Sequence, residues 1–107
     1  MDLSVFSRDY PEARAKFLAA AARRGARVQH WPHPLRGPLG EALATDTAWL
    51  GPEGAARVLV VLSGTHGVEG LAGSGPQIVF LHGALPGALP PDTAMLLVHA
   101  VNPHGFA

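Results

Sequence analysis

His66 and Glu69 are the two side chains of this sequence best suited to metal chemistry. They are three residues apart and follow directly on the apolar run 58–62. Side chains at this spacing share one face of a helical turn, so both can reach a single ion. A neutral imidazole and a carboxylate are ordinary zinc ligands, and catalytic zinc typically takes three protein ligands and a water. The pair therefore predicts two of the three ligands of a zinc site.

The same spacing has a second interpretation. A histidine and an acid can also cap a helix that follows a strand, and the spacing alone favours neither role. The run 58–62 contains only leucine and valine, which predicts a central strand buried on both faces of an α/β sheet. Ligands of such sheets bind at the carboxyl ends of the strands, where His66 and Glu69 fall.

A second apolar run, 93–101, predicts another buried strand, and it ends in the turn sequence Asn-Pro-His-Gly-Phe at 102–106. We expect this strand to lie parallel to 58–62 through a right-handed crossover, which brings the turn to the same edge. His104 would then face the predicted site. We expect the other histidines away from this site. His30 and His33 should lie on an exposed strand or loop, His82 at the end of a helix, and His99 in the core.

The remaining elements follow from capping and alternation signals. A helix is expected over 10–24, with Asp9 as its N-cap and Gly25 as its stop. Weak alternation predicts strands at 26–33 and 43–50, which can pair antiparallel across a turn-rich loop.

A second helix is expected over 70–82, followed by a loop at 86–91. Ser74 and Gln77 would cap this helix, and Pro76 would lie in its first turn, where proline is tolerated.

Composition narrows the class of protein. Eight basic and eight acidic residues give a formal net charge of zero without clustering, which argues against nucleic acid or an anionic membrane as a partner. The absence of cysteine excludes thiolate ligands. No apolar run has membrane-spanning length and no signal sequence is recognised, so we expect a cytoplasmic protein that acts on a small molecule or a peptide.

Two motifs in order, Gly-Thr-His-Gly-Val-Glu-Gly at 64–70 and Asn-Pro-His-Gly-Phe at 102–106, resemble the zinc carboxypeptidase superfamily. The similarity points to a bacterial branch catalogued as a domain of unknown function, near succinylglutamate desuccinylase and aspartoacylase. Segments 6–14 and 33–38 also resemble that branch. The resemblance implies a mixed-sheet α/β/α fold. Residues 1–107, with about four strands and two helices, would form the N-terminal portion of it as a single incomplete domain.

The resemblance also implies roles for particular residues. His66 and Glu69 match the first two zinc ligands, and the 102–106 turn precedes a substrate-binding arginine in the family, which assigns Asn102 and His104 to substrate binding. The family's third ligand, a histidine, and its general base, a glutamate, have no counterpart here. No catalytic residue is therefore assigned, and we expect part of a zinc-dependent amide hydrolase that is inactive alone.

Two alternatives remain open. The chain could be a non-catalytic metal-binding or interaction fragment that needs a partner chain. A serine hydrolase using His66 and Gly67 near an oxyanion hole is disfavoured, because no G-x-S-x-G motif is present. Two fully apolar strands with only about two helices also predict an uncovered sheet face or edge, and hence self-association or a complementary C-terminal chain.

Overall fold

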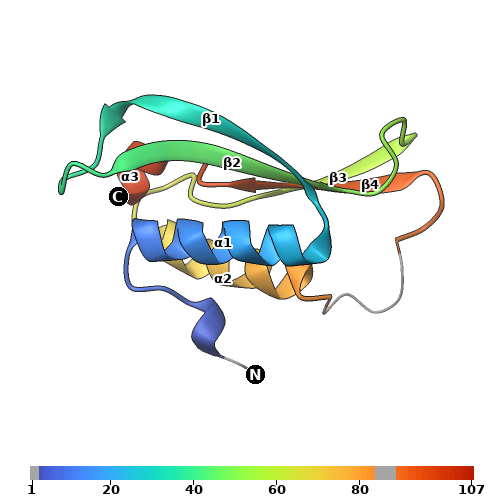
Figure 1. The fold of residues 1–107 in the computed structure, drawn as a ribbon, viewed down its shortest axis with the longest axis horizontal. Helices are drawn as coiled ribbons and strands as arrows, with labels where there is room; N and C mark the ends of the chain where they lie inside the picture. Colours follow the sequence, from blue (N-terminus) through green and yellow to red (C-terminus); the bar gives the residue numbers. More distant parts are fainter. Residues whose placement is uncertain (1–2, 84–88) are drawn as a thin grey trace.

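The chain folds into a mixed four-stranded sheet with two long helices against one face (Figure 1). The computed structural model describes residues 3–83 and 89–107, so the predicted loop at 86–91 lies partly outside the described residues. The elements, in order, are η1 (Leu3–Val5), α1 (Tyr10–Arg24), β1 (Arg27–Arg36), β2 (Ala42–Leu50), β3 (Arg57–Leu62), α2 (Glu69–Leu81), β4 (Thr93–His99) and α3 (Pro103–Phe106).

Helix α1 begins and ends at the predicted residues. The Asp9 side chain accepts a hydrogen bond from the backbone N–H of Glu12 at 3.0 Å, which satisfies one of the free donors of the first turn. The helix ends at Gly25, which adopts the left-handed conformation. Tyr10 and Phe17 are buried on its inner side, so capping and apolar spacing together determined this element.

The strand order is β1-β2-β4-β3. Strand β2 is antiparallel to both β1 and β4, whereas β3 and β4 are parallel, with α2 as their connection. The predicted pairings are confirmed. Strands β1, β3 and β4 consequently run in the same direction, and their carboxyl ends meet at one edge of the sheet.

Strand β3 is an edge strand, so the prediction that it is central and buried on both faces is wrong. Four of its six residues are large exposed hydrophobics, and Val60 and Leu62 leave 49% and 58% of their surface accessible. Leucine and valine make a strand apolar without indicating whether it has one neighbour or two. Strand β1 forms the other edge and continues to Arg36 through Pro32 and Pro34, beyond the predicted end, because an edge strand tolerates proline.

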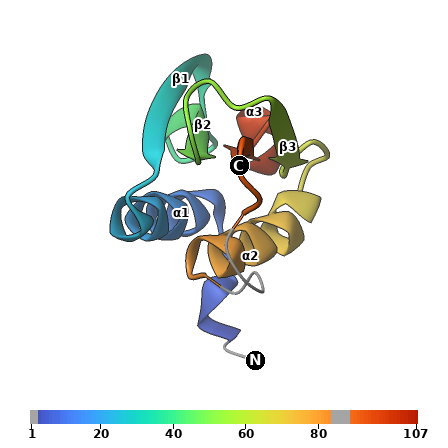
Figure 2. The same ribbon diagram turned by 90° about the vertical axis from the view of Figure 1, so that its right-hand side faces the viewer.

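Both long helices cover the same face of the sheet (Figure 1, Figure 2). Met95 and Leu97 of β4 pack in the core with Phe17 of α1 and Ile78 of α2. Side chains alternate along a strand, so Val60 and Leu62 of β3, with their partners in β4, point to the opposite face. The predicted uncovered face and edge are therefore present among the described residues, and the α/β fold class is confirmed.

Helix α2 differs from the prediction at its start. It begins at Glu69, so Ser74 and Gln77 lie inside it as buried polar residues and are not its caps. Gln77 donates to the carbonyls of Val61 and Val98, at 2.9 and 3.1 Å, and thereby ties the helix to both parallel strands. Pro76 lies in the middle of the helix on its exposed side, whereas His82 caps its C-terminus as predicted.

No helix within the described residues combines the length and the apolar character needed to cross a membrane.

Candidate metal and substrate site

The segments that follow β3 and β4 are held together by backbone hydrogen bonds. The N–H of Val101 donates to the carbonyl of Ser63 at 2.9 Å, and the N–H of Asn102 donates to the carbonyl of Gly64 at 2.8 Å. The pairing of the two strands thus continues beyond their ends. It brings the loop that carries His66 against the turn at 102–106.

Two glycines permit this close approach. Gly64 has φ +69°, and a Cβ atom there would lie 2.8 Å from Cα of Ala100. A Cβ atom on Gly70 would lie 2.2 Å from the ring of Phe106. That ring is buried and packs edge-on against Tyr10, with centroids 5.3 Å apart. The glycines around His66 therefore serve to seat Phe106 and the turn that contains it.

His66 and Glu69 lie on one tight turn that opens α2. The backbone N–H of Glu69 donates to the carbonyl of His66 at 3.1 Å, and both side chains are exposed. Val68 is the N-cap of α2, and no side chain caps this end of the helix. Neither His66 nor Glu69 forms a side-chain hydrogen bond or ion pair with the described residues. The helix-capping interpretation therefore has no bond to support it, and both donor groups are free.

The donor set is suitable for zinc but incomplete. An imidazole and a carboxylate on one turn are of the right chemical types. Within residues 3–83 and 89–107, however, no group of three or more His, Asp or Glu side chains gathers where it could hold a metal ion. These residues thus offer at most two of the usual three protein ligands at His66 and Glu69.

Asn102 and His104 lie on the turn that faces this loop. Asn102 caps the short helix α3, and its side-chain Oδ1 accepts a hydrogen bond from the N–H of Gly105 at 2.9 Å. The exposed ring of His104 stacks on that of His33, with centroids 5.7 Å apart and planes 13° apart. His33 lies on a strand, as expected, but its contact with His104 was not predicted from the sequence. The contact depends on β1 and β4 ending on the same side of the sheet, and no local pattern in the sequence indicates that order.

A buried ion pair between α1 and β2 was also missed. Asp46 is fully buried and accepts hydrogen bonds from Nε and a terminal nitrogen of Arg14 at 2.8 and 3.2 Å, and its Oδ1 lies 2.6 Å from Nδ1 of His30. Hydrogen bonding to Asp46 raises the pKa of Arg14. The available signal was the position of Asp46 between Ala44 and Ala48, on the inward face of β2.

His99 is a core residue, as predicted. Its Nε2 lies 2.8 Å from Oγ of Ser74, and its ring stacks on Phe17 with centroids 4.6 Å apart. Burial lowers the pKa of His99 from 6.5 to about 4, with the charge of Asp46 opposing this shift and that of Arg14 adding to it. His99 is therefore neutral in the folded chain at pH 7.

We expect acid to destabilise the chain through His99. The unfolded chain takes up a proton near pH 6.5 and the folded chain only near pH 4, so the stability present above pH 6.5 is lost as the pH falls through this window. The loss is on the order of 3 kcal/mol. Urea unfolding between pH 7 and 4 measures it. A His99→Gln variant should show a flatter dependence, and an equally steep one would contradict the role of His99.

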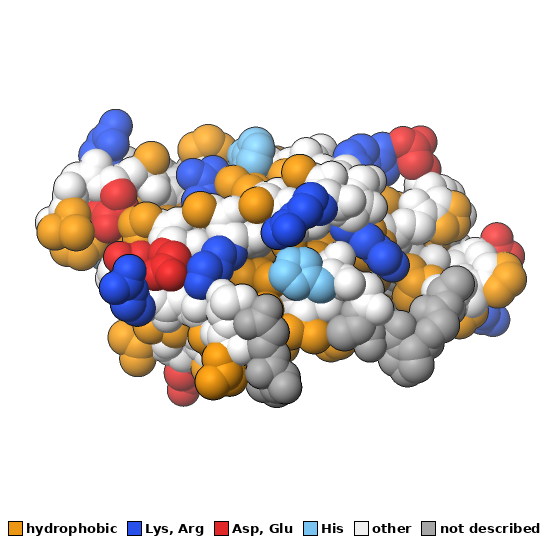
Figure 3. All heavy atoms as spheres, turned by 60° about the horizontal axis from the view of Figure 1, so that its bottom comes forward, with side chains coloured by type: hydrophobic (Ala, Val, Ile, Leu, Met, Phe, Trp, Pro, Cys, Tyr) orange, Lys and Arg blue, Asp and Glu red, His pale blue; other side chains and the backbone are white. Residues whose placement is uncertain are grey.

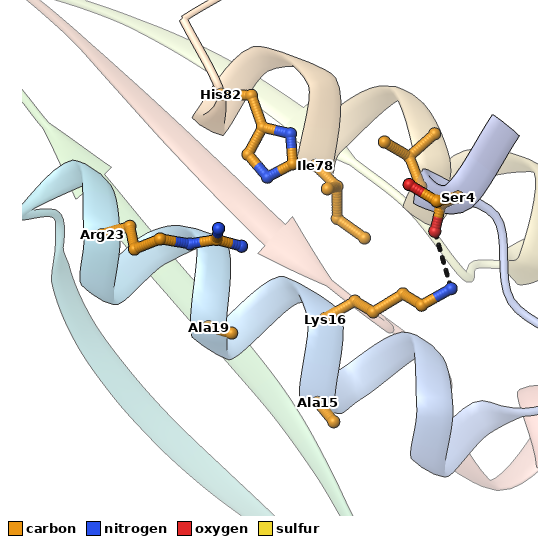
Figure 4. Close-up of a pocket in the computed structure, with 8 residues that line it drawn as sticks. Ser4, Ala15, Lys16, Ala19, Arg23, Ile78 and His82 are labelled. Carbon is orange, nitrogen blue, oxygen red and sulfur yellow. Dashed lines mark hydrogen bonds between the residues drawn. The ribbon is translucent and has the colours of Figure 1, made fainter. Parts of the chain in front are cut away.

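A separate hollow of about 380 Å³ lies between α1, α2 and η1 (Figure 3, Figure 4). Lys16, Arg23 and His82 surround its apolar floor (Figure 4). Nζ of Lys16 already donates to the carbonyls of Ser4 and Phe6, both at 2.7 Å. Arg23 and His82 lie at helix C-termini, where positive side chains balance the helix dipole. The three positive or titratable side chains around the hollow therefore have structural roles that explain their presence there.

Known structures share this fold. A glutaminyl cyclase from Porphyromonas gingivalis matches 83% of the chain with a TM-score of 0.51 and 21% identity. One from Tannerella forsythia also matches 83%, with a TM-score of 0.50 and 17% identity. A Zn-dependent exopeptidase from Parabacteroides distasonis matches 88%, with a TM-score of 0.50 and 16% identity. No curated protein matches the sequence.

The chain spans less than two fifths of these structures, covering 36%, 37% and 39% of their respective lengths. At these identities the likeness establishes the fold, which is that of part of a Zn-dependent exopeptidase-like domain. At the level of sequence, the family model described as "Protein of unknown function (DUF2817)" matches residues 6–107. The chain therefore belongs to the DUF2817 family.

Proposed function

We propose that this chain is the N-terminal portion of a zinc-dependent amide hydrolase of the carboxypeptidase type, as a single incomplete domain. The observation that carries the proposal is the position of His66 and Glu69. Both side chains are exposed and free of hydrogen bonds with the described residues, on the turn that opens α2 at the carboxyl end of a parallel strand. Ligands of α/β sheets bind at this edge.

Each part of the site has a separate task in this proposal. His66 and Glu69 would hold the ion, which when bound would polarise the scissile carbonyl and lower the pKa of a bound water. Asn102 and His104 would contact an acyl-amino acid or peptide substrate. The name of one similar structure, a Zn-dependent exopeptidase, supports zinc as the metal and a peptide as the substrate in this proposal.

We predict that the isolated chain binds zinc weakly. Two protein ligands leave the rest of the coordination to water, so affinity should fall well short of the roughly 10–16 kcal/mol of complete structural sites. His66→Ala or Glu69→Ala should abolish the binding in a calorimetric titration, and His82→Ala, at the other end of α2, should leave it unchanged. Equal affinity in all variants would refute the ligand assignment and would favour His30, His33 or His104 as adventitious ligands.

We also predict no measurable hydrolase activity from the chain alone. No general base and no cation that could stabilise a transition state is assigned at this sheet edge, and both are needed for efficient amide hydrolysis. The assay follows release of the free amine from N-acyl amino acids and short peptides with zinc added. Turnover that needs the metal and disappears in Glu69→Ala would show that the chain is a complete enzyme.

The second candidate function is a non-catalytic metal-binding or interaction fragment. Its support is the incomplete ligand set together with the exposed edge of β3. A complementary C-terminal chain that restores hydrolysis when mixed with this one would decide for the enzyme.

A further inference from the structure

The stacked pair His33 and His104 lies at the same edge of the sheet as the proposed metal ligands. Strands β1, β3 and β4 run in one direction and end together, and each is associated with a histidine at that end: His33, His66 and His104, respectively. The stacking fixes His33 against the turn that holds Asn102. His33, which belongs to the edge strand β1, thereby lies beside the turn to which substrate binding is assigned.

A backbone hydrogen bond sets the tautomer of His33. Its Nδ1 accepts from the N–H of Leu35 at 3.0 Å, so Nδ1 uses its lone pair there and the proton of the neutral ring resides on Nε2. Nε2 is then a hydrogen-bond donor. A metal ligand needs a free lone pair, so His33 in this state is not a zinc ligand through Nε2.

The side chain of Asn102, like the ring of His33, has N–H donors that are free to bind a ligand. Its Oδ1 accepts from the N–H of Gly105, which leaves the two N–H donors of Nδ2 without a partner among the described residues. Neither Asn102 nor the two stacked histidines carries a negative charge. The two histidines and Asn102 therefore offer N–H donors on the turn at 102–106 and on the strand that contacts it, which suits a group rich in acceptors.

We propose that His33 is a further substrate-binding residue, and that His33, Asn102 and His104 form a donor cluster for a carboxylate of the substrate. A carboxylate has two oxygens with about four lone-pair sites, and bonds to an ionised acceptor are roughly twice as strong as neutral ones. The proposal rests on the proposed function only in taking the bound carboxylate to belong to the substrate.

The test is binding of N-acetylglycine to the full chain without added metal, measured by calorimetry. Wild type should bind it saturably and more tightly than the uncharged N-acetylglycinamide. His33→Leu should weaken binding about tenfold, because it removes one hydrogen bond to a charged group. His33→Gln keeps an N–H near the position of Nε2 and should retain most of the affinity. His82→Ala, on an exposed histidine at the far end of α2, should have no effect.

Histidine ¹⁵N spectra give a second readout that does not depend on the folding of a variant. His33 should be protonated on Nε2, and that signal should shift as N-acetylglycine is added. Absence of binding in wild type, equal affinity in His33→Leu, or a proton on Nδ1 would each overturn the proposal. Because no zinc is present, failure of the metal assignment at His66 leaves these outcomes unaffected, and the two proposals fail separately.

Discussion

At roughly tens of micromolar, a range in which exposed apolar surface commonly drives association, the purified chain is expected to form dimers or larger species and to bind a hydrophobic dye. The cause is β3, whose backbone has no strand beside it on one side within the described part of the chain. Four of its apolar side chains are exposed, those of Val58, Leu59, Val60 and Leu62. An unpaired apolar edge is a template for pairing with another chain. Light scattering across a concentration series measures the association.

Two matched variants identify the surface responsible. Val60→Lys places a charge in the middle of the edge strand and should shift the chain toward monomer. Val68→Lys changes the same residue type at a site that is more exposed, 75% against 49%, but lies outside the sheet, and it should leave association unchanged. A stable wild-type monomer that binds no dye, or equal effects of both variants, would contradict the role of β3. A stable monomer that binds no dye would in addition overturn the fragment interpretation.

Gly64→Ala is expected to destabilise the chain by about 2–5 kcal/mol. Its φ of +69° is costly for any residue with a Cβ, by about 1–2 kcal/mol. The added Cβ would lie 2.8 Å from backbone Cα of Ala100, and overpacking of this kind typically costs about 1–3 kcal/mol more. Because this contact joins the ends of β3 and β4, the variant should also weaken zinc binding.

Gly40→Ala is the control for this prediction. Gly40 has φ +78° but open space where a Cβ would lie, so this variant should lose only the backbone term of about 1–2 kcal/mol. Urea denaturation of both variants isolates the contact between the two loops. Equal destabilisation would mean that the segments after β3 and β4 are not in close contact.

Local signals were enough to predict most elements of the fold. Asp9 and Gly25 bound α1 because their effects act within a few residues of the chain. The parallel pairing of β3 and β4 followed from two apolar runs separated by a helix. These features depend on neighbours in sequence, which a single sequence displays directly.

The errors arose where position depends on distant parts of the chain. Strand β3 is apolar enough for a central strand but lies at an edge, because strand order depends on pairings that periodicity does not encode. Ser74 and Gln77 resembled a helix cap, yet they are buried polar residues that bond to His99 and to the strand ends. A polar residue inside an apolar helix face can indicate such a partner.

In the candidate site, too, the features set by sequence neighbours were predictable and those set by distant parts of the chain were not. The positions of His66 and Glu69 at a strand end were predictable from the apolar run and the glycines that follow it. The approach of His33 was not, because it depends on β1 crossing to the same edge and on the orientation of the turn at 102–106. Whether His66 and Glu69 hold a metal stays a prediction, since the sequence supplies only the donor types.

X-ray diffraction from crystals soaked in zinc, recorded on both sides of the zinc absorption edge, tests the metal assignment most directly. An anomalous peak should appear between the side chains of His66 and Glu69, at about 2.0–2.2 Å from an imidazole nitrogen and a carboxylate oxygen. The other coordination positions should be filled by water. An empty position there, with zinc bound instead at His30, His33, His82 or His104, would contradict the account.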